Sequence, residues 1–186
     1  MILIESTREE YVTAQLAKFF AKRHVAGPPL NTLVIVADAI TARCDDVKQG
    51  ICHGVRTGDE CRSLTTVLKV PVYGTDIGPI SGEFMFGNFD FHEQKKEWVG
   101  SFDFVYSNAL DHSFNPGLAL RVWREQLRDG GVLCLHYTFP HRTPEPDRAD
   151  CFYGSLQEYI DLLATVTQGV DVIRISRRQR LLVGRT

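Results

Sequence analysis

Three polar residues that can take part in proton transfer follow an apolar segment near the middle of the chain. Residues 102–107 read FDFVYS, and Asn108, Asp111 and His112 come soon afterwards. An imidazole can accept a proton from a hydroxyl group, so His112 is a candidate general base, with Asp111 orienting it or touching the substrate. Both residues can instead hydrogen-bond the backbone around the next helix. The residues alone leave both interpretations open.

The elements around these residues indicate where they lie. Asn115 and Pro116 are a cap residue and a first-turn proline, so a helix begins there, and 129–131 read DGG, where a helix can end. A second apolar segment follows at 131–139. Strand, helix and strand joined by short connections predict two parallel strands. Residues 108–112 then lie at the carboxyl edge of the sheet, where ligands bind in such folds.

More polar residues and glycines follow other predicted strands. Gly54 and Gly58 come after the apolar segment that begins at residue 50, Asp76 ends another such segment, and Asp90 ends a third. A nucleoside ligand needs a tight glycine turn, a carboxylate that accepts hydrogen bonds from ribose hydroxyls, and a polar group beside the base. The order of these residues along the chain fits that requirement. The chain lacks G-x-G-x-x-G, which counts against a nicotinamide or flavin enzyme.

With these motifs, the segment 50–186 resembles class I S-adenosylmethionine-dependent methyltransferases. The family pattern acid-x-Gly-x-Gly-x-Gly aligns with 52–58, CHGVRTG, in which Gly54 and Gly58 are retained, Cys52 stands at the acid and Arg56 at the middle glycine. The family acid helps to hold the amino group of the cofactor's methionine end. The resemblance implies S-adenosylmethionine as cofactor, bound by Gly54, Arg56, Thr57, Gly58, Asp76, Ile77, Asp90, Phe91, Ser107 and Asn108.

Arg56 is the departure with the clearest chemical consequence. A guanidinium at this position can bind the methionine carboxylate of the cofactor. The same long side chain can instead fill the pocket. The sequence is compatible with both possibilities.

Further candidate residues follow the apolar segment 131–139. His136, Tyr137 and His141 lie toward the predicted ligand edge, and we interpret them as substrate contacts. For His136, alternation along a strand also predicts ordinary core packing, and we expect no metal site. The polar segment 140–150 is interpreted either as a lid over the substrate or as a plain surface loop.

The whole chain is predicted to adopt an α/β fold. We expect a doubly wound, mainly parallel, seven-stranded Rossmann-like methyltransferase sheet whose last strand is antiparallel, because residues 171–185 read as a hairpin. Residues 1–48 are expected to form an N-terminal helical segment packed on the core, and 49–186 the methyltransferase-like domain. Predicted helices cover 7–24, with a Ser6–Glu9 capping box, then 59–68 and 155–166, and a strand covers 83–90. The segment 30–43 is compatible with a helix or a strand, and its alanine-rich second half favours a helix.

The expected function is S-adenosylmethionine-dependent methyl transfer to a small-molecule acceptor. The alternatives are a non-catalytic methyltransferase-like binding or scaffold protein and another enzyme with an adenosine ligand. A net charge of −2 gives no general attraction to nucleic acid or acidic membranes. Five cysteines without a C-x-x-C pair and an N-terminus without a signal-like segment predict a cytoplasmic protein.

Overall fold

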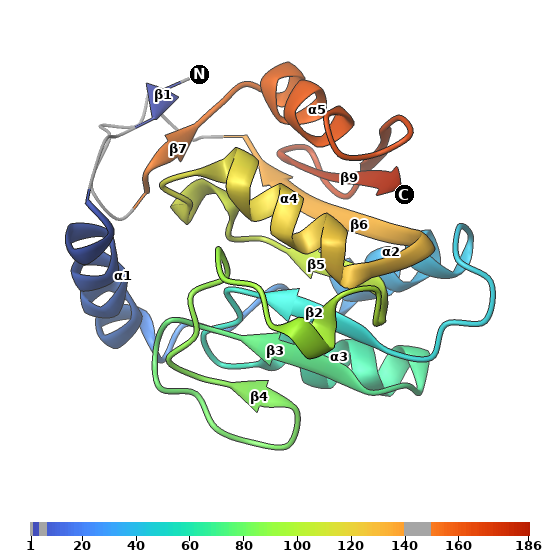
Figure 1. Ribbon diagram of the computed structural model, residues 1–186. Coiled ribbons are helices and arrows are strands. Elements are labelled where there is room, and N and C mark those ends of the chain that lie inside the picture. Colours follow the sequence, from blue (N-terminus) through green and yellow to red (C-terminus); the bar gives the residue numbers. More distant parts are fainter. Residues whose placement is uncertain (1, 4–6, 140–149) are drawn as a thin grey trace.

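The computed structural model describes residues 2–3, 7–139 and 150–186, which form one large sheet covered by helices on both faces (Figure 1). The strands are β1 (Ile2–Leu3), β2 (Gly50–His53), β3 (Val72–Thr75), β4 (Met85–Phe86), β5 (Phe102–Ser107), β6 (Leu127–Thr138), β7 (Phe152–Tyr153), β8 (Asp171–Arg174) and β9 (Gln179–Arg185). The helices are α1 (Arg8–Lys22), α2 (Leu30–Thr41), α3 (Asp59–Leu68), α4 (Pro116–Gln126) and α5 (Leu156–Ala164), with short 3-10 turns η1 (Lys96–Trp98) and η2 (Leu110–His112).

The large sheet has seven strands in the order β4-β3-β2-β5-β6-β9-β8. The first five strands of this order are parallel, and β9 runs antiparallel to both of its neighbours. The predicted seven-stranded sheet with an antiparallel last strand is therefore confirmed. The hairpin between β8 and β9 is also confirmed, with Arg174 opposite Arg180. Strands β1 and β7 form a separate antiparallel pair that the sequence pattern does not indicate.

Alternating side chains of β5 divide the core into two clusters. All six residues of this strand are buried, as expected for the central strand of a sheet covered on both faces. Phe104 and Tyr106 pack with α2 and α3, whereas Val105 packs with α4 and α5. One layer of helices therefore packs on each face of β5, and the strand is buried between them.

Three predicted boundaries are wrong in detail. Helix α4 ends at Gln126 because Leu127 is already extended (φ −77°, ψ 138°), so the glycines of 129–131 lie inside the long strand β6, where Gly130 has φ +74°. The strand predicted over 83–90 is reduced to β4, since the flanking Phe84 and Asn88 have positive φ. The capping box of α1 is formed by Thr7 and Glu10, one residue beyond the predicted pair.

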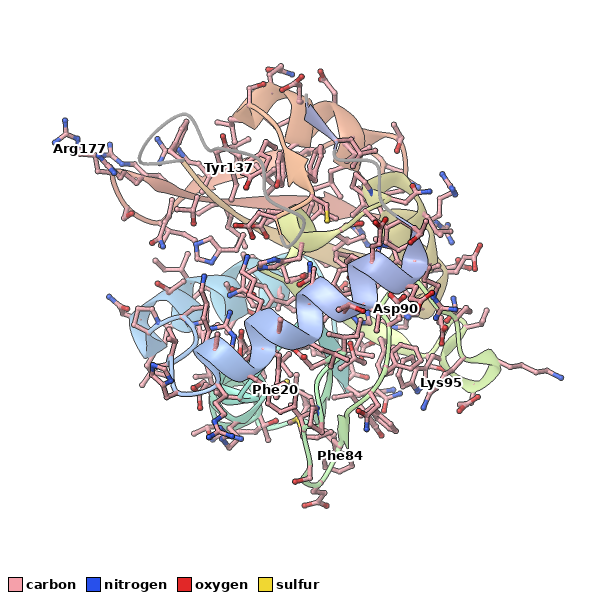
Figure 2. All side chains as sticks on the ribbon, turned by 90° about the vertical axis from the view of Figure 1, so that its left-hand side faces the viewer. Phe20, Phe84, Asp90, Lys95, Tyr137 and Arg177 are labelled. Atoms are coloured by element: carbon pink, nitrogen blue, oxygen red, sulfur yellow. The ribbon has the colours of Figure 1, made fainter. Side chains whose placement is uncertain are left out.

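Helix α1 crosses the edge of the sheet at which the parallel strands end (Figures 1 and 2). Charge pairs hold its first residue, Arg8, to Asp90 and Glu93, and hold Lys18, one turn before its last residue, to Asp150. In the part of the chain that the structure describes, no helix combines the length and apolar character needed to cross a membrane.

Candidate functional site

The turn between β2 and α3 has the backbone shape of a glycine-rich turn although one glycine is replaced. Gly54 and Gly58 both have φ +73°, and a Cβ atom at Gly54 would lie 2.4 Å from that of Ala109. Arg56 also has a positive φ, 43°, a conformation that costs a non-glycine residue roughly 1–2 kcal/mol. The fold therefore keeps the turn at this position and accepts strain in the arginine backbone.

Asp76 directly follows β3, and its carboxylate is hydrogen-bonded to the backbone of this turn. Its Oδ2 accepts the N–H of Arg56 at 2.7 Å, and its Oδ1 accepts the N–H of Gly78 at 2.8 Å. Burial raises the pKa of the Asp76 carboxyl, while these two hydrogen bonds act in the opposite direction. Each carboxylate oxygen has a further lone pair, so Asp76 can accept hydroxyl hydrogen bonds from a ligand.

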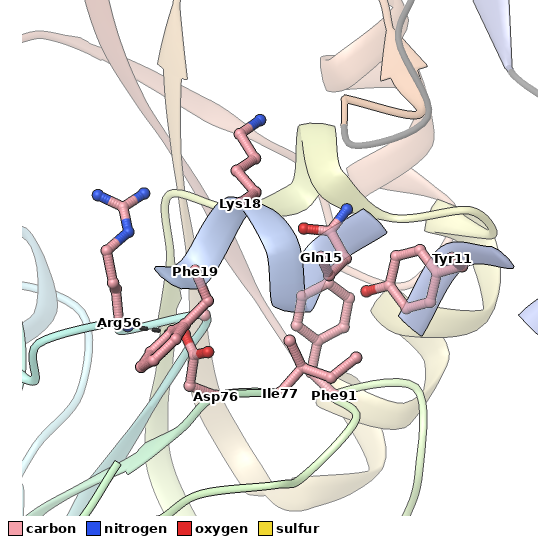
Figure 3. A pocket seen from close by; sticks show the side chains of 9 residues that line it. Tyr11, Gln15, Lys18, Phe19, Arg56, Asp76, Ile77 and Phe91 are labelled. Carbon is pink, nitrogen blue, oxygen red and sulfur yellow. Dashed lines mark hydrogen bonds between the residues drawn. The ribbon is translucent and has the colours of Figure 1, made fainter. Parts of the chain in front are cut away.

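A small cavity lies between α1 and the strand ends, and we call it the α1 cavity (Figure 3). Its volume is about 50 Å³. The ring of Phe19 fills space above Asp76, and a Cβ atom at Gly78 would lie 2.2 Å from that ring. The lining consists of Tyr11, Gln15, Lys18, Phe19, Gly54, Arg56, Asp76, Ile77 and Phe91.

A larger cavity of about 320 Å³ lies on the other side of the glycine turn, and we call it the α3 cavity. Its walls come from the loop between α1 and α2, the glycine turn, the first turn of α3, and the ends of β5 and β6. They consist of Val25, Ala26, Gly27, Pro28, Pro29, Gly54, Val55, Arg56, Thr57, Glu60, Asn108, His136, Thr138 and Gln179. Gly54 and Arg56 line both cavities, so the two cavities adjoin at the turn.

Two ionisable side chains of the α3 cavity carry unpartnered polar atoms. Oε2 of Glu60 and Nε2 of His136 are buried and have no hydrogen-bond partner among the described residues. Burial raises the pKa of Glu60 to about 7 and lowers that of His136 to about 4. Glu60 is not among the site residues predicted from the sequence. The sequence feature that could have indicated Glu60 is its position two residues after Gly58, the last residue of a glycine motif whose acid is replaced by Cys52.

His112 lies beneath α1, in contact with charged groups from two distant segments. Its Nδ1 lies 3.1 Å from Oδ1 of Asp150 and 3.2 Å from Nζ of Lys18, and its Nε2 lies 3.8 Å from Oδ1 of Asp111. Asp111, His112 and Asp150 offer three potential metal-ligand atoms within 4.8 Å of one another. Lys18, which pairs with Asp150, already supplies a cation there. His112 does not line the α1 or the α3 cavity.

Other predicted site residues make internal contacts. Asp90 accepts hydrogen bonds from the backbone and ring of His92, at 3.0 and 2.6 Å. Ser107 donates to the His53 carbonyl at 3.0 Å. Tyr137 is buried against α5 and donates to the Gly154 carbonyl. His141 lies outside the described residues.

The comparisons with known proteins concern the whole described fold. No protein-family model matches the chain, and no curated protein sequence matches it. In structure, the chain is similar to 1,6-didemethyltoxoflavin-N1-methyltransferase of Burkholderia thailandensis, crystallised with 1,6-didemethyltoxoflavin and S-adenosylhomocysteine. That match has a TM-score of 0.73 and 15% identity, and covers 100% of this chain and 93% of that one.

Two sugar-modifying enzymes show the same likeness. An amino pentose methyltransferase from Micromonospora echinaspora, with bound S-adenosylmethionine, has a TM-score of 0.69 and 17% identity, with 92% of this chain and 97% of that one covered. A sugar N-methyltransferase from Streptoalloteichus has a TM-score of 0.66 and 14% identity, with 91% of both chains covered. The chain therefore has the fold of class I S-adenosylmethionine-dependent methyltransferases.

Proposed function

We propose that the protein transfers a methyl group from S-adenosylmethionine to a small-molecule acceptor. The observation that carries the proposal is the junction of the two cavities, where the glycine turn and the Asp76 carboxylate meet at the carboxyl edge of a methyltransferase-type sheet. The relatives in structure include a toxoflavin-precursor enzyme and sugar enzymes, which favours a small acceptor over a macromolecule.

The residues of the turn fit this cofactor. Asp76 would accept hydrogen bonds from the ribose hydroxyls, and Ile77 and Phe91 supply apolar walls for the adenine. Phe19 and Tyr11 of α1 leave only about 50 Å³ there, far less than a ligand-sized pocket of about 300 Å³ or more, so the adenosine end needs α1 or its side chains to move. The α3 cavity has room for the amino-acid end.

When bound, the cofactor supplies an electrophilic methyl group on its sulfonium. The protein's own work is then to hold a nucleophile in line with that group and to exclude water. Asn108 and His136 face the α3 cavity from the ends of β5 and β6 and are our candidates for contacts with the acceptor. The low pKa of His136, about 4, keeps its imidazole neutral at neutral pH. His112, with Asp111, stays a candidate general base whose ring is oriented by Asp150.

A non-catalytic binding protein is the second candidate function. It is favoured by Cys52 and Arg56, which replace the acid and the middle glycine of the family pattern. A third candidate is another enzyme with an adenosine ligand. The carboxylate of Asp76 would suit the ribose of any such ligand, so the fold alone does not exclude this candidate.

Calorimetric titration distinguishes these candidates. We expect S-adenosylmethionine and S-adenosylhomocysteine to bind the purified protein, and ADP and NAD to bind at least tenfold more weakly. Preference for ADP or NAD would favour the third candidate. Binding of S-adenosylmethionine without turnover of any amine, hydroxyl or carbon acid in a small-molecule acceptor panel would favour the second candidate. No binding of any of the four ligands would contradict the proposal.

A further inference from the structure

Glu60 is a buried carboxylate that has no partner for one of its oxygens. It lies in the first turn of α3 with an exposed fraction of 3%, and its Oε2 accepts no hydrogen bond from any described residue. This oxygen lies close to the backbone of the loop at Gly27, where a Cβ atom would be 3.0 Å away. A buried carboxylate without a partner is costly, by at least 1–3 kcal/mol, so a compensating role is expected for it.

The usual role of an acidic residue in a first helical turn does not explain Glu60. The neighbouring Asp59 already fills that role, because its carboxylate accepts hydrogen bonds from Thr57 Oγ1 at 2.7 Å and from Arg62 at 2.6 Å. Asp59 is partly exposed and fully partnered, whereas Glu60 is turned into the α3 cavity. The two adjacent acids therefore differ in their contacts, and Glu60 is the one available to a ligand in the α3 cavity.

The position of Glu60 also relates to the missing acid of the glycine motif. Cys52, which stands at that acid position, is fully buried, and burial is the main cause of the raised pKa of its thiol, with a smaller contribution from the charge of Glu60. Glu60 lines the same cavity as Gly54, the residue that directly follows β2. Glu60 therefore brings a carboxylate close to the strand end from which the family acid is absent. Arg56 lines the same cavity and supplies the opposite charge.

We propose that Glu60 binds the α-ammonium group of the cofactor's methionine end and replaces the acid absent at Cys52, while Arg56 binds the α-carboxylate. The ligand of the α3 cavity is thus the zwitterionic amino-acid end of an S-adenosyl compound. This inference rests on the proposed function. It adds a residue that the glycine motif does not contain and explains why one oxygen of a buried acid has no hydrogen-bond partner among the described residues.

The test compares two ligands that differ only at this end. S-adenosylhomocysteine carries the amino acid, and 5′-methylthioadenosine carries the same adenosine and sulfur without it. We expect Glu60→Gln to weaken binding of S-adenosylhomocysteine by about tenfold to 100-fold, as for other hydrogen bonds to charged groups, and to leave 5′-methylthioadenosine unchanged. Glu97→Gln is the control, since Glu97 is exposed in η1 and outside both cavities.

The outcomes separate this inference from the function on which it rests. Equal binding of S-adenosylhomocysteine by the wild-type protein and Glu60→Gln, or equal loss of both ligands in the variant, would overturn the role of Glu60 alone. If the wild-type protein binds neither ligand, the proposed function and this inference both fall. Circular dichroism checks the fold of the variant, in which a neutral amide replaces a buried acid.

A second measurement needs no variant. Because the pKa of Glu60 is about 7, its ionised fraction rises from about one tenth at pH 6 to about three quarters at pH 7.5. The ligand's ammonium stays mainly protonated in this range, so binding of S-adenosylhomocysteine should tighten by about eightfold, and binding of 5′-methylthioadenosine should not change. A flat profile for both ligands would contradict the proposal.

Other groups around Glu60 do not produce the same profile. Asp59, whose pKa is lowered chiefly by its hydrogen bond from Thr57, is ionised throughout this range, and Arg56 contributes a positive charge. Tyr106 and Cys52 stay protonated because burial raises their pKa values, and His136 stays neutral. The pKa of Asp76 is raised by burial, but its ribose contacts would affect both ligands equally. The differential pH effect is therefore assigned to Glu60.

Discussion

The two cavities that meet at the glycine turn differ in how they are closed. The α1 cavity is covered by side chains of a helix distant in sequence and has a volume of about 50 Å³, whereas the α3 cavity is about 320 Å³ and keeps unpartnered atoms of Glu60 and His136. The ring of Phe19 fills part of the α1 cavity, which we assign to the adenosine end of the cofactor. The α3 cavity holds two polar atoms that lack a hydrogen-bond partner among the described residues. The adenosine end is thus expected to bind with rearrangement, and the amino-acid end to be formed in advance.

The largest effect is expected at Asp76, which belongs to the adenosine end. Asp76→Ala should weaken S-adenosylhomocysteine binding by about 1.5–3 kcal/mol, because in the proposed binding mode the carboxylate would accept two hydrogen bonds from the ribose hydroxyls. Binding of 5′-methylthioadenosine should fall equally, in contrast to the effect of Glu60→Gln. Calorimetric titration measures both ligands, with the exposed Asp38→Ala as control. Unchanged affinity in a folded Asp76→Ala protein would remove this residue from the site.

Arg56→Gly tests whether the arginine binds the cofactor or blocks it. If its guanidinium binds the methionine carboxylate, S-adenosylhomocysteine affinity should fall by about tenfold although the family residue is restored. The free energy of unfolding should not fall, since glycine tolerates the positive φ of 43°. Arg56→Lys, which keeps the charge, should retain part of the affinity. Tighter binding by Arg56→Gly would show that the arginine blocks the pocket and would favour the non-catalytic candidate.

A smaller effect is expected at Phe19, the ring that fills the α1 cavity. Phe19→Ala removes contacts worth about 1 kcal/mol that a ligand would otherwise displace, so 5′-methylthioadenosine should bind about fivefold more tightly. Phe20→Ala serves as the matched control, because the side chain of Phe20 is 52% exposed on the same helix. Weaker binding by Phe19→Ala would mean that the ring contacts the bound ligand and does not block it. The proposed difference between the α1 and α3 cavities would then be wrong.

The smallest effect concerns the charge pairs that hold α1 over the site. Burial raises the pKa of Asp150, but its bonds with His112 and Lys18 outweigh this and hold the pKa well below its usual value. Such a lowered pKa stabilises the fold above about pH 4, the unfolded value, and the contribution is lost as the pH falls further. Asp150→Asn should therefore cost about 0.5–1 kcal/mol at pH 7 and less below pH 4.

Hydrogen exchange of the α1 amides is the direct measurement for Asp150→Asn. We expect faster exchange in α1 at pH 7 and unchanged exchange in β5, because the contact concerns the helix and not the central sheet. Faster exchange throughout the chain would instead indicate a general loss of stability.

The sequence predicted the sheet where its signals were local. The helix over 155–166, the Asn115–Pro116 helix start and the hairpin of 171–185 each depend on signals within a few residues, and all three are observed. In the structure the first of these helices begins with a capping box of Ser155 and Glu158. The boundary at 129–131 was mispredicted because glycine there serves a bend within β6 rather than the end of α4. A glycine with positive φ occurs both at the end of a helix and at a bend within a strand. The pairing of β6 with β5 and β9 decides that 129–131 form a bend within the strand.

For the site, the sequence by itself determined which turn and which acid lie at the carboxyl edge, since Gly54, Gly58 and Asp76 follow consecutive parallel strands. Only the tertiary structure decided that Phe19 of α1 covers that acid and that Lys18 and Asp150 meet at His112. It also decided that Oε2 of Glu60 is buried without a hydrogen-bond partner among the described residues, while the carboxylate of Asp59 beside it accepts hydrogen bonds. The physical reason is that burial and charge pairing depend on segments far apart in the chain, whereas turns and caps depend on neighbours.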